Sequence, residues 1–127
     1  MSIFNRFYKK EKMLSRTLEI DDCLYEKLEY LSENVYDASI NKLVNAAIEE
    51  IIETENIKFY KPKRNSYVAR SFLIRESFLE ELYLLKKKYR ISIYLLVNIA
   101  IKNAIDEWEE TAENEIIEQL NKRMCEK

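Results

Sequence analysis

Lysine and arginine are the residues of this sequence whose spacing suggests chemistry, because they gather in two segments. Residues 1–16 carry five basic side chains and one acid, for a local charge of +4, and residues 58–75 carry six and no acid. Basic clusters of this kind favour the binding of phosphate groups. The remainder of the chain is acidic, and the formal net charge is −2. The local charge of these two segments therefore favours a phosphate-rich partner, whereas the net charge of the chain disfavours one.

Residue types that carry catalysis are scarce. The sequence has no histidine and no glycine, and its two cysteines, Cys23 and Cys125, lie far apart. These absences disfavour histidine-based acid–base chemistry, the common zinc sites and glycine-rich phosphate loops. Adjacent carboxylates such as Glu49 and Glu50 point about 100° apart on a helix, so they form no catalytic pair. We therefore expect no enzyme, no metal and no cofactor.

The sequence shows the pattern of neither a membrane-spanning segment nor a signal peptide. No apolar run reaches the ~18 residues of a membrane span. Residues 1–12 alternate apolar and charged side chains and lack the continuous apolar region of a signal peptide. We expect a cytoplasmic protein with reduced thiols and no membrane partner.

The sequence repeats itself at an interval of about 53 residues. Seven of ten positions are identical between residues 39–48 and 92–101, and the identities include a serine and an asparagine. Upstream the match continues at an interval of 54, where Arg16 corresponds to Arg70. One residue is lost in the turn between the two helices, where length changes are tolerated best. The ordered match favours an internal duplication over chance similarity between amphipathic helices.

Each copy predicts a strand followed by two helices. In the first copy, apolar residues alternate over 14–20, recur at helical spacing over about 22–34, and do so again from Ser39 to about 55. The second copy repeats these patterns. They cover 67–74, about 76–88, and the residues that follow Ser92.

The chain therefore divides into five segments. These are a basic N-terminal arm over 1–13, a first unit over 14–55, a basic linker over 56–66, a second unit over 67–108, and a C-terminal helical extension over 109–127.

A short strand must pair to satisfy its backbone groups, and the chain supplies two. We expect a mostly α protein in which these strands form a two-stranded antiparallel β-ribbon. This pattern resembles the ribbon-helix-helix superfamily of Arc, MetJ and CopG-like regulators, over residues 14–108. Two units in one chain are similar to the TraY-like proteins of the conjugation relaxosome. The resemblance implies a tandem ribbon-helix-helix chain whose units share one core as an intramolecular pseudo-dimer.

The resemblance also implies a function. Members of this superfamily read DNA with the ribbon, which fits the major groove. We expect a sequence-specific double-stranded DNA-binding protein, either a transcriptional repressor or a plasmid or conjugation accessory factor. On this register the residues that face outward to the bases are Ser15, Thr17, Glu19, Ala69, Ser71 and Leu73. Arg16 and Arg70 lie at the inward phase, from which long side chains can swing out to guanine or phosphate.

Phosphate contacts are expected in three places. The basic arms that precede the strands contribute Lys9, Lys10, Lys12, Lys61, Lys63 and Arg64. The second helices begin after Ser39 and Ser92, where free N–H groups and the helix dipole favour a phosphate. A basic cluster precedes the second of these sites, formed by Lys86, Lys87, Lys88 and Arg90.

The first copy departs from this pattern. Glu19 lies on the expected reading face, and Glu33 and Asp37 replace the basic cluster. A non-identical pair suits an asymmetric DNA site, whereas a degenerate first copy would keep only the fold. The alternative function is a protein–protein interaction module, antitoxin-like or scaffolding, whose DNA-binding face has degenerated.

The last predicted helix has no stop signal. Residues 93–124 contain neither proline nor glycine, and an apolar stripe runs through Ile105, Trp108, Ala112, Ile116, Leu120 and Met124. Two interpretations remain open. The tail either folds back on the apolar residues Ile3, Phe4, Phe7 and Tyr8, or presents a face for self-association or for a protein partner.

Overall fold

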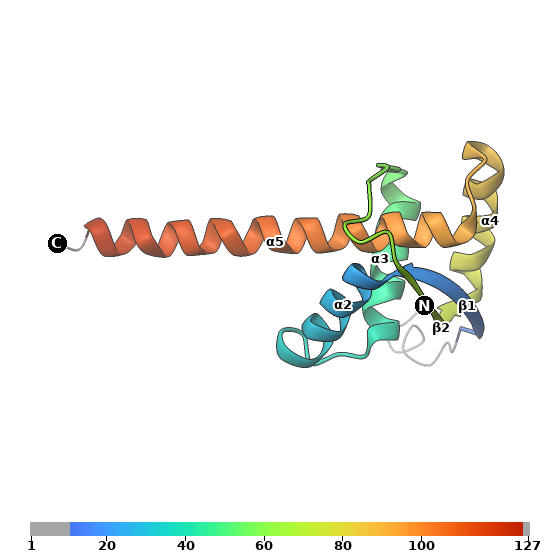
Figure 1. Cartoon of the computed structure of the whole chain (residues 1–127), viewed down its shortest axis with the longest axis horizontal. Helices are drawn as coiled ribbons and strands as arrows, with labels where there is room; N and C mark the ends of the chain where they lie inside the picture. The colour runs from blue at the N-terminus through green and yellow to red at the C-terminus, as the bar shows by residue number, and fades with distance from the viewer. Residues whose placement is uncertain (1–10, 126–127) are drawn as a thin grey trace, which may run out of the picture.

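The computed structural model describes residues 11–125, and within the last helix it describes side chains up to Ile116 and at Glu118. Four helices and one two-stranded antiparallel sheet make up this part of the chain (Figure 1). The elements in chain order are β1 (Met13–Asp21), α2 (Asp22–Asn34), α3 (Ile40–Thr54), β2 (Tyr67–Arg75), α4 (Glu76–Tyr89) and α5 (Ile93–Cys125). The predicted strands, and the predicted starts of all four helices, agree with these bounds to within a residue or two.

The register of the ribbon follows the internal repeat. Thr17 pairs with Ser71, the residue that corresponds to it in the second copy. Equivalent residues therefore meet at the centre of the ribbon. Alternation decides which side is buried, because successive strand residues point to opposite faces. Ile20, Phe72 and Ile74 point to the helix side and are buried. The strand residues that point to the other face of the ribbon are exposed, apart from Asp21.

Side-chain caps explain where two of the helices begin. Asp21 accepts a hydrogen bond from the Cys23 backbone N–H at 3.0 Å, and Ser39 accepts one from the Lys42 backbone N–H at 3.2 Å. Both satisfy N–H groups that lack a partner in the first helical turn. The C-terminal ends of α3 and α4 adopt the left-handed conformation that usually favours glycine, here at Glu55 and Arg90. A chain without glycine must use other residues there.

The two copies share one hydrophobic core. α3 packs against α5, and each of these helices also contacts the first helix of the other copy, so that α2 meets α5 and α4 meets α3. Ile48, Leu82 and Ile99, from three different helices, are all fully buried. One cluster of buried residues therefore contains side chains from both copies.

α5 extends well beyond this core. It runs without interruption from Ile93 to Cys125 and projects away from the other elements (Figure 1). The predicted long helix is therefore confirmed, and within the described residues it does not turn back. Ile3, Phe4, Phe7 and Tyr8, the expected acceptors of a returning tail, lie outside the described residues. None of the described helices combines the length and the apolar character needed to cross a membrane.

Candidate nucleic-acid interface

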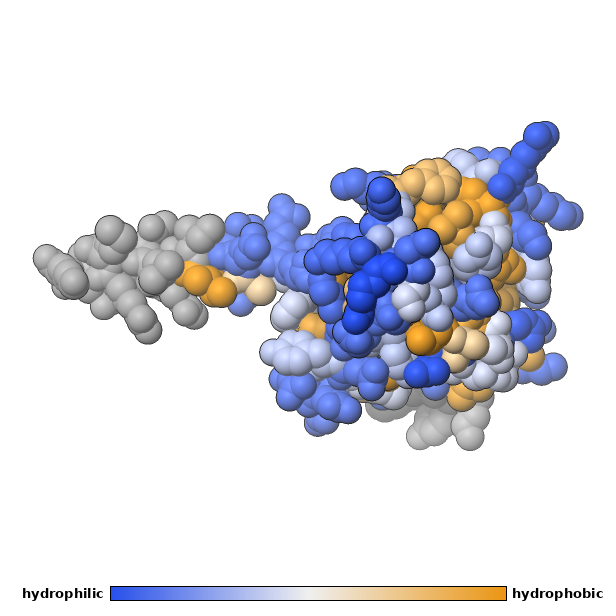
Figure 2. Space-filling model, in the orientation of Figure 1, coloured by the Kyte–Doolittle hydropathy of each residue, from blue (hydrophilic) through white to orange (hydrophobic). Residues whose placement is uncertain are grey.

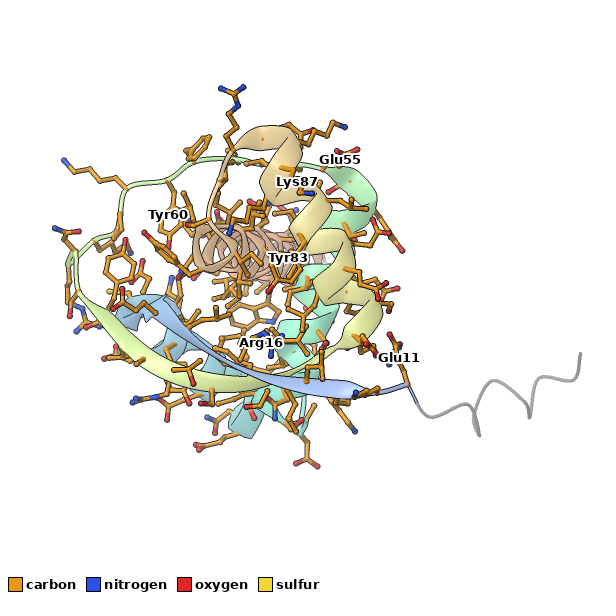
Figure 3. The ribbon with its side chains drawn as sticks, turned by 90° about the vertical axis from the view of Figure 1, so that its right-hand side faces the viewer. Glu11, Arg16, Glu55, Tyr60, Tyr83 and Lys87 are labelled. Atoms are coloured by element: carbon orange, nitrogen blue, oxygen red, sulfur yellow. The ribbon has the colours of Figure 1, made fainter. Side chains whose placement is uncertain are left out.

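One face of the ribbon is open in the described part of the chain. The six residues expected to face outward are all exposed, and we call them the exposed ribbon face: Ser15, Thr17, Glu19, Ala69, Ser71 and Leu73. They pair across the ribbon as Ser15 with Leu73, Thr17 with Ser71, and Glu19 with Ala69. In Figure 3, α4 and α5 lie on the other side of the ribbon. The exposed ribbon face offers a narrow, two-stranded surface of four small side chains, one carboxylate, and the large apolar side chain of Leu73, which is 44% exposed.

A pair of hydroxyl groups occupies the centre of the exposed ribbon face. Thr17 Oγ1 and Ser71 Oγ lie 2.8 Å apart and share a hydrogen bond. One hydroxyl donates this bond and the other accepts it. The accepting hydroxyl therefore still has its own O–H to donate, and both oxygens can accept a further bond from an external group. The centre of the face is therefore polar, uncharged and able both to donate and to accept.

Arg16 and Arg70 take equivalent positions on the helix side of the ribbon. Each guanidinium donates a hydrogen bond at 3.0 Å to the backbone carbonyl of the preceding residue, Ser15 or Ala69. Both side chains are exposed, and Arg16 points toward the helices in Figure 3. The Arg70 guanidinium also lies 4.9 Å from the ring centre of Tyr25, a cation–π distance. Neither arginine reaches across the exposed ribbon face in this structure.

Two buried asparagines fix the ribbon to the helices, and sequence reasoning missed this role. Asn98 of α5 bonds the Glu19 carbonyl at 2.9 Å and the Asp21 N–H at 2.9 Å, on the free edge of β1. Asn45 of α3 does the same for Leu73 and Arg75 on the free edge of β2, at 2.7 and 3.1 Å. The signal was present, because this asparagine is one of the polar identities of the repeat.

These anchors set where the second helices begin. The first turn of α3 lies at the edge of β2, where Asn41 Oδ1 accepts a hydrogen bond from the Leu73 N–H at 3.1 Å. The first turn of α5 lies at the edge of β1, because Asn98 also bonds the Tyr94 carbonyl. The N-terminal ends that follow Ser39 and Ser92 therefore flank the two long edges of the ribbon.

The basic linker lies away from the exposed ribbon face. Tyr60 Oη donates a hydrogen bond to Asp21 Oδ2 at 3.1 Å, and partial burial together with this carboxylate raises the pKa of Tyr60. Arg64 pairs with Glu26 at 2.9 Å and also contacts Asp22. Lys61 and Lys63 line a cavity of about 260 Å³ that also contains acidic residues of α5. Of these three expected phosphate ligands, Arg64 is paired with carboxylates, whereas Lys61 and Lys63 form no ion pair among the described residues, because the α5 carboxylates of the cavity pair with Lys27 and Lys102.

The basic cluster before α5 is more open. Lys86, Lys87 and Arg90 are exposed and form no ion pair among the described residues, whereas Lys88 bonds Glu55 at 2.7 Å. This bond, with a second from Tyr89, lowers the pKa of Glu55. Lys12 is exposed at the start of the ribbon, and Lys9 and Lys10 lie outside the described residues. Lys87 is labelled in Figure 3, at the end of α4.

The first copy is acidic where the second is basic. Glu33 in the last turn of α2 and Asp37 between α2 and α3 are exposed, at the position that corresponds to the cluster of lysines. Glu19 is exposed on the ribbon itself. The surroundings of the α3 and α5 starts therefore differ in charge although the backbone repeats, whereas Glu19 lies at the α5 end of the ribbon, where Asn98 bonds its carbonyl.

One group of side chains has the composition of a metal site. Ligand atoms of Asp21, Asp22 and Cys23 lie within 4.8 Å of one another. Asp21 already accepts bonds from Tyr60 and from the Cys23 N–H, and Arg64 donates to Cys23 Sγ at 3.0 Å. The Arg64 guanidinium beside the group supplies positive charge, with its Nε 3.4 Å from Asp22 Oδ1. That carboxylate oxygen is buried and accepts no hydrogen bond.

Comparison with known proteins gives no relative. No family model, curated protein or solved structure matches the chain. The functional argument therefore rests on the residues and their geometry.

Proposed function

We propose that this chain is a sequence-specific double-stranded DNA-binding protein built as a tandem ribbon-helix-helix pseudo-dimer. It inserts the exposed ribbon face into a major groove and acts as a transcriptional repressor or as a plasmid or conjugation accessory factor. The observation that carries the proposal is the ribbon itself, in which Thr17 lies opposite Ser71 and all six outward residues are exposed. A two-stranded ribbon fits the major groove, where each base pair presents its own pattern of donors and acceptors.

The pseudo-dimer part of the proposal is supported by matched contacts. Asn45 and Asn98 make the same three kinds of hydrogen bond, two to the strand of the other copy and one to the carbonyl four residues earlier in their own helix. Arg16 and Arg70 likewise repeat one backbone contact. Contacts that repeat with the sequence are those expected of two equivalent units related by an approximate two-fold axis through the ribbon centre.

Phosphate binding is assigned to the helix ends that flank the ribbon. Backbone N–H groups at the starts of α3 and α5 lie at its two edges, where the DNA strands would pass on either side of the groove. Lys86, Lys87 and Arg90 strengthen the α5 end. Because Arg64 is paired with carboxylates, it contributes less than the sequence suggested.

The charge difference between the two ends favours an asymmetric target. Glu33 and Asp37 repel phosphate at one end, and the lysines attract it at the other. A single chain with two unlike halves suits a DNA site without two-fold symmetry.

Selection of bound duplexes from a random pool, with the full chain at low salt, tests the proposal. We expect enrichment of one non-palindromic motif. Thr17→Ala should weaken binding to the selected duplex about fivefold, because a base contact is lost, and leave random duplex unchanged. Thr54→Ala makes the same chemical change on α3, away from the ribbon, and should have no effect. A pool without enrichment, or equal losses for the two variants, would contradict the proposal.

A protein–protein interaction module is the second candidate function. Glu19 on the exposed ribbon face and the long projecting part of α5 favour it. Non-specific DNA binding by a basic surface has dissociation constants of roughly 10⁻⁴ to 10⁻⁶ M at physiological salt and tightens at lower salt. Failure to bind any duplex at micromolar protein and low salt would support this candidate instead.

A further inference from the structure

Glu19 and Leu73 occupy equivalent positions at opposite ends of the exposed ribbon face. Each follows the central hydroxyl residue of its strand, Thr17 or Ser71, by two positions, and the two central residues pair with each other. The carbonyl of Glu19 accepts a hydrogen bond from the buried asparagine of α5 at 2.9 Å, and that of Leu73 accepts one from the buried asparagine of α3 at 2.7 Å. The repeat therefore presents a carboxylate at one end of the face and a large apolar side chain at the corresponding place on the other.

The apolar end of the face includes a second side chain. Met13 lies diagonally across the ribbon from Leu73, because Met13 pairs with Arg75 and Ser15 with Leu73. Met13 is 41% exposed and Leu73 is 44% exposed. One exposed leucine is ordinary on a protein surface. Two neighbours of this kind on one strand face make that end apolar, whereas the corresponding place at the other end carries the charge of Glu19.

Charges beside the apolar end suit a partner that bears phosphates. Lys12 precedes Met13, and Lys42 lines the same surface hollow as Met13, together with one further basic residue and one acid. Both lysines are exposed, and neither forms an ion pair among the described residues. An apolar patch on the projecting part of α5 has the opposite surroundings (Figure 2), because residues 106–118 contain seven acidic residues and no basic one. The apolar end of the ribbon therefore attracts DNA, whereas the patch on α5 repels it.

Cytosine and thymine differ in the major groove at the groups that these two side chains can contact. Cytosine presents an amino group, whereas thymine presents a carbonyl oxygen and a methyl group. A carboxylate accepts a hydrogen bond from the amino group and is repelled by the thymine oxygen, and an apolar side chain contacts the methyl group. An approximate two-fold axis through the ribbon centre places equivalent side chains over equivalent bases of two half-sites. At that base, Glu19 therefore suits cytosine and Leu73 suits thymine.

We propose that the two half-sites of the target duplex differ at the base read by this pair of residues, with cytosine under Glu19 and thymine under Leu73. The inference rests on the proposed DNA-binding function and specifies what that function recognises. Thr17 and Ser71 both carry a hydroxyl, so the centre of the face does not distinguish the two halves of a site. Glu19 and Leu73 do distinguish them, and they determine which way round the chain lies on its target.

Removal of one methyl group from the DNA tests the thymine contact without any change to the protein. In the duplex selected by the full chain, deoxyuridine replaces each thymine of the motif in turn. At one thymine we expect the affinity of the wild-type chain to fall about fourfold, as for the loss of one buried methyl group. Leu73→Ala should show no loss there, because it already lacks the contact. Deoxyuridine outside the motif is the control. A motif in which no thymine responds, or equal responses of the two chains, would overturn the proposal.

Exchange of Glu19 tests the equivalence of the two positions. Glu19→Leu gives both ends of the face the same side chain, so selection from a random pool should return thymine at that position of both half-sites. Glu53→Leu makes the same change at an exposed position of α3 and should return the wild-type motif. A motif that Glu19→Leu leaves unchanged would overturn this inference while DNA binding stands. A wild-type chain that selects no motif would overturn both.

Discussion

Single residues decide how well the exposed ribbon face suits DNA. Its centre is a neutral pair of hydroxyls, Thr17 and Ser71, held 2.8 Å apart. Its one carboxylate is Glu19, which is exposed and repels phosphate. A glutamate can accept a hydrogen bond from a cytosine amino group, so the same side chain can serve specificity while it lowers affinity for other sequences.

Replacement of Glu19 separates these two effects. We expect Glu19→Gln to strengthen binding to random duplex about fivefold at low salt, because a like charge is removed beside the phosphates. Glu53→Gln removes the same charge from an exposed position on α3 and serves as the control. Fluorescence anisotropy with labelled duplex measures both. Equal changes in the two variants would place the bound DNA away from the ribbon.

At the scale of elements, the buried asparagines join the ribbon to the helices. Asn98 is 1% exposed and bonds both the N–H and the C=O of the free edge of β1. A two-stranded ribbon has two free edges, and backbone groups left without a partner inside a protein are costly. The two asparagines satisfy part of each edge from the helix that packs beside it.

Loss of this anchor should be visible in stability. Asn98→Ala leaves a buried N–H and a carbonyl unsatisfied, so we expect the free energy of unfolding to fall by about 2–4 kcal/mol. Asn103 lies on the same helix as Asn98, and its side chain donates an exposed hydrogen bond to the Asn56 carbonyl. Asn103→Ala removes this bond and should lower the free energy of unfolding by less than about 1 kcal/mol. Urea denaturation followed by circular dichroism gives both values. Similar losses would argue that Asn98 does not hold the ribbon.

The boundaries of the helices and strands were predictable because apolar residues recur every second residue in a strand and every three to four residues in a helix. Alternation over 14–20 and helical spacing from Leu24 to Leu31 each match only one kind of structure. The helix start after Ser39 was predictable from its capping side chain. The role of Asn45 and Asn98 was not predictable from a local pattern, because each bonds a strand more than 25 residues away.

The position of the linker was also beyond the sequence. A run of lysines and arginines predicts a solvated basic arm, but Tyr60 bonds Asp21, and Arg64 pairs with the acidic start of α2. These contacts depend on how the linker returns from α3 to β2, which composition does not encode. Neither could the sequence decide whether the end of α5 turns back or projects.

At the scale of the whole molecule, the ribbon and the projecting helix lie on different parts of the structure. The exposed ribbon face lies opposite the helices, and α5 leaves the core away from the ribbon (Figure 1). Charge also differs between these two parts, because the projecting part of α5 is acidic up to residue 118.

The central claim is that the ribbon is the surface that touches DNA. Backbone amide chemical shifts of the full chain, recorded by NMR before and after addition of the selected duplex, test it most directly. We predict that the largest changes fall at Ser15–Glu19 and Ala69–Leu73 and at the starts of α3 and α5. Changes confined to the part of α5 beyond Trp108, or to the outer sides of α2 and α4, with the ribbon unaffected, would contradict it.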